Sequence, residues 1–299
     1  MKNRPWLVGA WAVIATSLLT GAALAVPDWQ AVDSVFGFQP KVLAGDVHRY
    51  GWPRSDLHVV LDGVELEPAL ALGAWAGFVS TGAGDEVMAM GDLVLLDSEV
   101  NPVVSALQAG GVDITAIHNH LLRESPHVTY VHFMAHGDAF AIAKGLRAAI
   151  EKTKIPSPSS AKVEPTVAQQ AALKAVEDAL GRAGSMAGRV LQVGVPRAEK
   201  IEEDGMEVPA SIGMSNSMNF QVVGDRVATT GDFVLIASEV NPVIRELRAH
   251  GLEVTAIHSH MLEESPRLFF MHFWGIDSPQ EVGEALKAAL ARVNTKPAK

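Results

Sequence analysis

The chain has 299 residues, of which 48% are hydrophobic, and its formal charge at pH 7 is −10. This length and apolar content suffice for a full hydrophobic core, and at roughly 100 to 200 residues per domain they suggest two domains. The acidic charge excludes electrostatic steering toward a nucleic-acid backbone, so we expect no nucleic-acid partner. The sequence contains no cysteine, which excludes disulfides, thiolate metal sites and a lipidated cysteine.

Residues 1–25 have the features of a secretory signal peptide. Lys2 and Arg4 make the start basic, an apolar run covers residues 6–24, and a small-x-small cleavage signal ends at Ala25. We therefore expect cleavage after Ala25 and a periplasmic or secreted mature chain without a membrane span. The alternative is an uncleaved N-terminal anchor, because the apolar run approaches the ~20 residues that span a bilayer.

The chain contains an internal duplication. Residues 91–136 recur at residues 231–276 without a gap, and 24 of the 46 aligned positions are identical. A stretch rich in proline and serine separates the two copies and has no hydrophobic periodicity, which is typical of a solvated linker. The sequence thus divides into a signal peptide (1–25), repeat 1 (26–152), a linker (153–166), repeat 2 (167–293) and a tail (294–299).

Each repeat is predicted to begin with an amphipathic helix and to continue with short strands. The helices are expected at residues 32–36 and 173–180. The strands are expected at residues 41–47, 57–61, 75–80 and 86–90 in repeat 1, and at 189–195 and 219–223 in repeat 2.

The matched block predicts a β-α-β-β-α order. A strand at 93–96 precedes a helix that Asn101 caps and that ends at Gly110, and strands at 112–121 and 128–134 precede a closing helix at 139–150. We expect Gly91-Asp92 to form a turn into a strand and Glu99 to stabilise the helix start. The fold class predicted is α+β: two tandem homologous repeats, each a mainly antiparallel sheet with helices on one face and a ferredoxin-like core, packed as a pseudo-dimer.

Both copies keep three histidines and one glutamate. Residues two apart on a strand share a face, so the histidines of each His-x-His segment are expected to project together. A register that sets His132 opposite His118, and His272 opposite His258, adds a third imidazole to each pair. A shift of one residue would turn the third histidine to the other face. The predicted metal ligands are His118, His120, His132, His258, His260 and His272.

Three neutral imidazoles that leave one position open are typical of a catalytic zinc site, and an added carboxylate suits manganese or iron. Zinc is the first candidate, with manganese, iron and copper as alternatives. Glu124 and Glu264 are the candidate catalytic residues, as a general base or a further ligand. The spacing His-x-His-x-x-x-Glu resembles the first metal motif of the cupins, although the later cupin motif is absent. The alternative is that the histidines are hydrogen-bonded core residues and the glutamates belong to solvated turns.

Several segments together resemble one known family. They are Glu99-Val100-Asn101-Pro102-Val103, Thr115-Ala116-Ile117-His118-Asn119-His120, Thr255-Ala256-Ile257-His258-Ser259-His260 and Met271-His272-Phe273-Trp274. They look like the LppY/LpqO family of bacterial envelope proteins, whose members carry this duplicated block, and the resemblance spans roughly residues 29–293. It implies an exported bacterial protein and no established activity. The founding members are lipoproteins, whereas this chain has no cysteine to lipidate.

Three functions agree with these observations. The first is a metal-binding envelope protein that acts as a metal-dependent hydrolase, with a small molecule or a cell-envelope component as its ligand. The second is a non-catalytic binder of metal or ligand. The third is a structural envelope module with the histidines in its core. Whether the chain is an enzyme stays open at this point.

Overall fold

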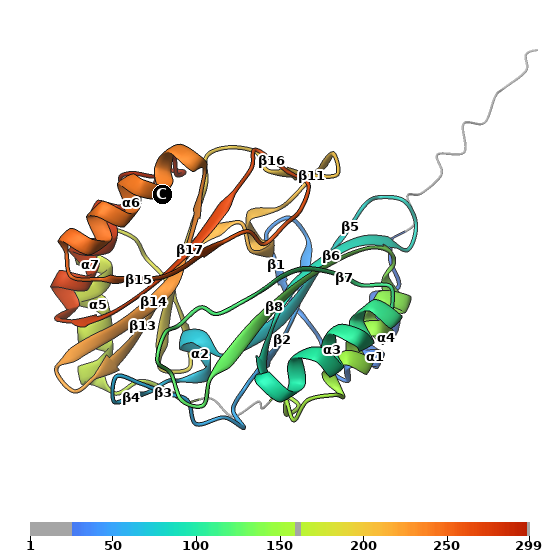
Figure 1. Cartoon of the computed structure of the whole chain (residues 1–299), viewed down its shortest axis with the longest axis horizontal. Coiled ribbons are helices and arrows are strands. Elements are labelled where there is room, and N and C mark those ends of the chain that lie inside the picture. Colours follow the sequence, from blue (N-terminus) through green and yellow to red (C-terminus); the bar gives the residue numbers. More distant parts are fainter. Residues whose placement is uncertain (1–25, 159–162, 298–299) are drawn as a thin grey trace, which may run out of the picture.

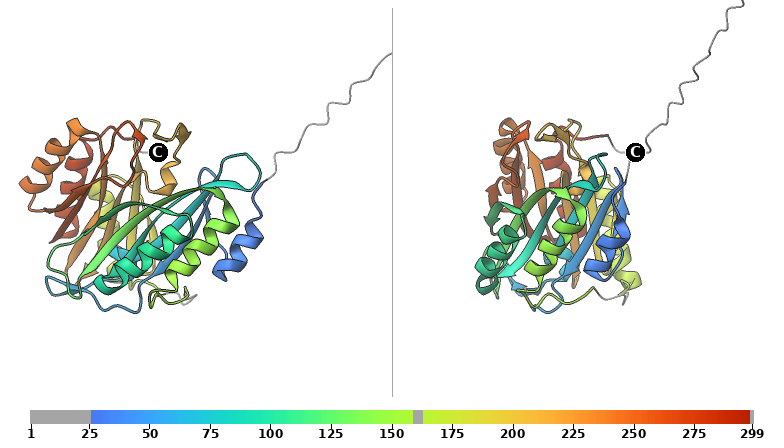
Figure 2. Two further views of the ribbon diagram at one scale, coloured as in Figure 1. Left: turned by 45° about the vertical axis from the view of Figure 1, so that its right-hand side comes forward. Right: turned by 90° about the vertical axis from the view of Figure 1, so that its right-hand side faces the viewer.

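The computed structural model describes residues 26–158 and 163–297. The expected signal peptide, part of the linker and the last two residues lie outside the described residues. Two antiparallel sheets face one another, and the long helices cover their outer faces (Figure 1). Figure 2 shows the same layers from two other sides. The chain therefore has an α+β fold of two tandem repeats, as predicted.

Repeat 1 forms a six-stranded sheet in the order β1-β2-β5-β6-β8-β7. All of its neighbouring strands are antiparallel. Its elements are α1 (Trp29–Phe36), β1 (Lys41–Leu43), β2 (Val47–Pro53), β3 (Val60–Leu61), β4 (Val64–Glu65), α2 (Pro68–Ala71), β5 (Gly73–Ser80), β6 (Glu86–Leu96), α3 (Asp97–Ala109), β7 (Asp113–His118), β8 (Val128–Asp138) and α4 (Ala139–Ile150).

Repeat 2 repeats this plan with the sheet order β15-β17-β14-β13-β10-β9. A 3-10 helix, η1, stands where repeat 1 has α2. Its elements are α5 (Val167–Leu180), β9 (Ser185–Ala187), β10 (Val190–Pro196), β11 (Glu202–Glu203), β12 (Met206–Glu207), η1 (Ala210–Ile212), β13 (Ser215–Val223), β14 (Arg226–Leu235), α6 (Ala237–Ala249), β15 (Glu253–His258), β16 (Glu264–Ser265), β17 (Phe269–Asp277) and α7 (Pro279–Leu290).

The helix boundaries follow from local capping. Asp28 precedes α1, and its carboxylate accepts a hydrogen bond from the Ala31 amide, while Gly37 ends the helix with a positive φ of 82°. Thr166 and Gln169 form a capping box that starts α5, so repeat 2 begins where the linker was predicted to end. The helix predicted at 139–150 coincides with α4.

The hydrophobic core has three parts. Each sheet packs its outer face against its own helices, and in repeat 1 the rings of Phe36 and Tyr50 lie 4.6 Å apart in this layer. The third part lies between the two sheets and takes side chains from both repeats, including Met88 and Met90 from repeat 1 and Met261 and Phe270 from repeat 2. Burial of this third cluster favours the face-to-face arrangement.

In each repeat a buried ion pair connects the sheet to a helix. The pair joins the end of β2 to α3 in repeat 1, and the end of β10 to α6 in repeat 2. The Arg54 guanidinium donates to Glu99 at 2.7 Å, and Arg197 donates to Glu239 at 2.6 Å. Each glutamate also accepts a hydrogen bond from the amide three residues before it, which confirms the predicted role of Glu99 at the helix start. The repeated Pro-Arg-x-acidic segments at 53–56 and 196–199 are the sequence signal for this pair.

Two predicted local structures are wrong. Gly91-Asp92 is not a turn, because β6 runs without interruption from Glu86 to Leu96 and Asp92 lies in its middle. Gly91 is needed there because a Cβ atom would collide with the Trp75 carbonyl and the Phe133 ring. The following helix begins at Asp97 instead of after Asn101, since the Glu99 carboxylate caps it one turn earlier.

The predicted register between the two histidine strands is also corrected. Ala116 lies opposite His132, His118 lies opposite Tyr130, and a bulge shifts the pairing before Ala116. The strand ends at His118, so His120 belongs to the following loop. The observed pairing differs from the predicted one by two residues, because the loop between β7 and β8 is not symmetric about the predicted turn. A shift of two residues leaves His132 on the same face of the sheet as His118.

Among the described residues, no helix combines the length and apolar character needed to cross a membrane.

Candidate metal centre

The six predicted histidines meet in one cluster between the two sheets. Each of the three shortest stacks between two histidine rings joins a histidine of repeat 1 to a histidine of repeat 2. The ring centroids are 3.5 Å apart for His118 and His258, 3.6 Å for His120 and His272, and 3.7 Å for His132 and His260. The two histidine sets therefore form a single group.

Three kinds of position supply these rings. His118 and His258 are the last residues of β7 and β15, and His132 and His272 lie inside β8 and β17. The loop histidines are held by aromatic neighbours: the Tyr130 ring stacks on His120 at 3.4 Å, and the Phe270 ring stacks on His260 at 3.6 Å. The aromatic residue two before each strand histidine thus fixes a second imidazole.

Many imidazole nitrogens in the cluster are buried and have no hydrogen-bond partner among the described residues. They are Nε2 of His118, His120, His132 and His272, and Nδ1 of His258. Burying such a nitrogen unpaired costs free energy, typically ~1–3 kcal/mol. Metal coordination could satisfy this group of unpaired imidazole nitrogens, and hydrogen-bonded core pairs are the alternative. Within the cluster, one such pair is present, with Nε2 of His258 and His260 2.7 Å apart.

The donor atoms are close enough to share metal ions. One nitrogen from each of five histidines lies within 4.8 Å of the others, and a second group joins His260 and His272 to Asp232. The five are His118, His120, His132, His258 and His260. Histidine groups of this kind could hold a metal ion, with zinc, manganese, iron and copper as candidates on chemical grounds.

Two aspartates flank the histidines, of which Asp92 is buried and Asp232 is partly buried. Asp92 oxygens lie 3.7 Å from His132 Nε2 and 3.9 Å from His120 Nε2, and an Asp232 oxygen lies 3.8 Å from His260 Nε2. Burial raises the pKa of both aspartates well above the usual range. Asp92 and Asp232 were not predicted as site residues, although the Gly-Asp pair that is unchanged in both copies was the signal for them.

Burial also keeps the imidazoles neutral, which is the form that binds a metal. It lowers the pKa of His118 to about 4 and that of His272 to about 3. The pKa values of His120, His132 and His260 are lowered well below the usual range by burial and, to a lesser extent, by the neighbouring histidines.

Glu124 and Glu264 lie outside both donor groups. The Glu264 carboxylate accepts hydrogen bonds from the Leu268 amide at 2.9 Å and from Arg267 at 3.1 Å. Glu124 has the matching contact, a longer hydrogen bond of 3.4 Å from the Val128 amide. Each glutamate thus closes the loop that carries the second histidine, and a catalytic or ligand role for it stays a prediction.

The other histidines do not join the cluster. His136, a candidate for enriching the first site, is exposed. His48 was expected on the surface, but it is buried because its ring stacks on Trp29 at 3.8 Å. His58 is exposed and pairs with Glu65 at 2.7 Å.

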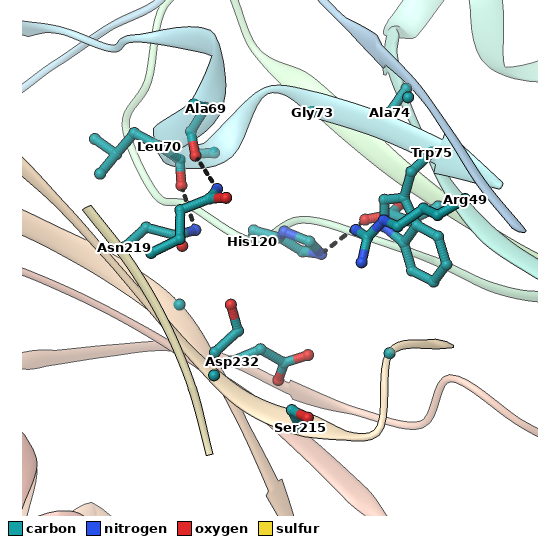
Figure 3. Close-up of a pocket in the computed structure, with 18 of the residues that line it drawn as sticks. Arg49, Ala69, Leu70, Gly73, Ala74, Trp75, His120, Ser215, Asn219 and Asp232 are labelled. Carbon is teal, nitrogen blue, oxygen red and sulfur yellow. Dashed lines mark hydrogen bonds and ion pairs between the residues drawn. The ribbon is translucent and has the colours of Figure 1, made fainter. Parts of the chain in front are cut away.

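A cavity of about 590 Å³ adjoins the cluster and is lined by both repeats. His120, His132, His260, His272, Asp92 and Asp232 all contribute to its wall. Figure 3 shows His120 and Asp232 on opposite sides of this space, with Arg49 and Trp75 at one end and Asn219 at the other. A molecule in the cavity would therefore contact the imidazoles and both carboxyl groups.

Comparisons with known proteins give little functional information. No curated protein matches at a significant level. Among solved structures, the trimeric bacterial microcompartment shell protein PduB aligns at 11% identity over 84% of this chain and 89% of that chain, with a TM-score of 0.19. EtuB from Clostridium kluyveri aligns at 11% identity over 87% and 95%, and TP0453 at 9% over 74% and 81%, both with a TM-score of 0.20. Scores this low carry no argument.

The family comparison is more informative. The model described as Domain of Unknown Function (DUF1259) matches residues 30–152 and residues 174–292, which together make up more than half of the chain. The two matched segments coincide closely with the two repeats deduced from the sequence, whereas the LppY/LpqO name stays a prediction. The chain belongs to the DUF1259 family and carries two copies of its domain.

Proposed function

We propose that the protein is an exported metal-dependent hydrolase whose two repeats act as a pseudo-dimer with one composite metal centre. The observation that carries this proposal is the set of unpaired, buried imidazole nitrogens from both repeats beside a cavity. Either repeat alone would supply three of the six imidazoles. The repeats therefore complete the donor set only together.

The donor set favours a transition metal over calcium or magnesium, because those cations prefer oxygen ligands. Zinc fits best among the candidates, since neutral imidazoles with a carboxylate are its usual ligands in catalytic sites. Manganese, iron and copper also accept such ligands. Because the sequence contains no cysteine, any metal must be held through nitrogen and oxygen.

A bound metal would supply Lewis acidity and lower the pKa of a coordinated water. The side chains beside it are suited to move the proton. Asp92 and Asp232 have raised pKa values and lie within 4 Å of the imidazoles, so each can hold a proton and pass it on. Glu124 and Glu264 position the loops that carry His120 and His260.

Metal content is the first test. The mature chain, purified without a histidine tag, is analysed for metals beside the variant His118→Ala/His120→Ala. We expect near-stoichiometric transition metal in the wild type and its loss in the variant. A folded wild-type protein that binds no metal after incubation with zinc, manganese, iron and copper would overturn the proposal and favour the structural envelope module.

Turnover is the second test. The metal-loaded protein is assayed with chromogenic phosphate esters and carboxylic esters. Replacing a general base or acid typically costs ~10²–10⁴ in rate, so Asp92→Asn, which lies outside both donor groups, should lose activity by this order while keeping metal. Asp225→Asn, at an exposed residue, is the control. Metal binding without turnover would contradict the hydrolase and leave the non-catalytic binder.

A further inference from the structure

The two walls of the cavity differ in charge, although they come from equivalent strands. In repeat 1, Lys41 of β1 lies opposite Arg49 of β2, and both line the cavity. In repeat 2, Ser185 of β9 lies opposite Gln192 of β10 in the same relation. Repeat 1 thus presents two cations where repeat 2 presents a hydroxyl and an amide.

The next strand continues this difference. Trp75 of β5 lies opposite Gly51, and its counterpart in repeat 2 is Ser217, which lies opposite Gly194. The guanidinium of Arg49 stacks over the Trp75 ring, 4.1 Å from its centroid. This stacking fixes the plane of the guanidinium and supports it from one side.

The N–H groups of Arg49 are available to a ligand. No ion pair or hydrogen bond engages the Arg49 side chain in the part of the chain that the structure describes, and its edge faces the cavity (Figure 3). Burial lowers the pKa of Arg49 only to about 10, against the charge of Asp92, so it stays protonated at neutral pH. A planar guanidinium with free N–H groups is suited to bind a carboxylate or a phosphate.

The opposite wall has free acceptors. The side-chain amides of Gln192 and Asn219 donate to the carbonyls of Ala69 and Leu70 at 2.9 Å and 2.8 Å. These bonds use the N–H groups and turn the amide oxygens away from the carbonyls, and Oδ1 of Asn219 is buried without a partner among the described residues. A hydroxyl group of a ligand would satisfy such an oxygen.

We propose that the cavity binds a hydroxylated organic anion, with its carboxylate or phosphate on Arg49 and Lys41 and its hydroxyl groups on Asn219 and the other polar side chains of repeat 2. The volume of about 590 Å³ lies in the range of small-molecule sites, about 300–1,000 Å³. This inference rests on the proposed function, for which it names the substrate class. The ligand extends along the wall that contains His120 and His132.

Direct binding tests the inference without requiring turnover. Calorimetry on the zinc-incubated mature protein uses three probes: glucuronate, glucose 6-phosphate and glucose. We expect one or both anions to bind and glucose to bind at least tenfold more weakly. Binding of glucuronate alone identifies a carboxylate as the anionic group, and binding of glucose 6-phosphate alone identifies a phosphate.

Two substitutions replace each cation of repeat 1 with the residue at the equivalent position of repeat 2. Arg49→Gln removes a charge-assisted hydrogen bond, so anion binding should weaken roughly 10- to 100-fold, and Lys41→Ser should weaken it less because Lys41 is exposed. Arg245→Gln, at an exposed residue of α6, is the control and should leave binding unchanged. Equal binding of glucose and the anions, no binding of any probe, or an unchanged affinity in Arg49→Gln would overturn the inference. Because metal content is measured separately in each variant, failure of the metal centre is distinguishable from failure of the anion site.

Discussion

The stacking of His118 on His258 makes a quantitative prediction about metal binding. If these rings belong to one composite centre, His118→Ala and His258→Ala should each remove nearly all of the metal, although they lie in different repeats. Structural zinc sites with four ligands contribute roughly 10–16 kcal/mol, or about 3 kcal/mol per ligand. Since 1.4 kcal/mol corresponds to a tenfold change, each substitution should weaken binding by about 100-fold.

Thermal unfolding measures this effect on the whole protein. A metal at 100 times its dissociation constant stabilises the folded state by about 2.7 kcal/mol, which corresponds to roughly 5–10 °C in Tm for a chain of this size. At the same metal concentration, a 100-fold weaker variant gains only about 0.4 kcal/mol, or about 1 °C. Elemental analysis after gel filtration gives the matching stoichiometry.

His58→Ala is the matched control, because His58 is exposed and lies outside the donor groups. It should keep the full metal content and the full rise in Tm. A result in which His118→Ala and His258→Ala each retain half of the metal, bound with the affinity of the wild type, would refute the composite centre and favour two separate sites. Full metal content in both variants would refute the assignment of these residues as ligands.

Three further predictions concern stability. Glu99→Ala removes one of the two carboxylates that pair with the buried Arg54 and leaves Asp56 as the other, so it should lower the free energy of unfolding in urea by about 1.5–3 kcal/mol, whereas a loss below 1 kcal/mol would contradict the ion-pair argument. In the metal-free protein, burial lowers the pKa of His118 to about 4. Between pH 6.5 and pH 4, His118 is therefore protonated in the unfolded chain and neutral in the folded protein. Stability should therefore fall as the pH drops from 6.5 to 5, by about 2 kcal/mol from this residue, and His118→Ala should make the fall of the urea midpoints over that range less steep, while the other buried histidines keep their share of it. Equal slopes would speak against a neutral His118. Gly231→Ala should destabilise the protein by about 1–3 kcal/mol and weaken metal binding, because a Cβ atom there collides with the Ser217 carbonyl next to Asp232; unchanged unfolding and metal affinity would show that β14 adapts freely.

The duplication made much of the fold and the histidine set predictable. Two diverged copies that keep the same polar residues point to constrained positions, so the six histidines that the structure brings together could be predicted from the sequence. The strict periodicity of residues 139–150 likewise gave the closing helix with correct bounds. These features depend on local pattern, which the sequence carries directly.

The features that were missed depend on packing between distant segments. Asp92 reads as a turn residue beside Gly91, and only the neighbouring Trp75 and Phe133 explain why a strand needs glycine there. The bulge before Ala116 and the asymmetric loop between β7 and β8 make the strand register differ from the predicted one. Hydrophobic alternation alone does not reveal either feature. The meeting of His118 with His258 depends on how two whole sheets face each other, and no local sequence pattern encodes that.

The covalent joining of the two repeats has a consequence for the chemistry on their shared surface. Two identical subunits around a twofold axis must place every residue there twice, so a ligand on the axis meets the same groups from both sides. Repeats within one chain mutate independently. Here the histidines and aspartates are the same in both halves, while the position that Arg49 occupies in one half is occupied by Gln192 in the other. Fusion thus allows a centre built from matched halves to distinguish the two ends of an unsymmetrical molecule.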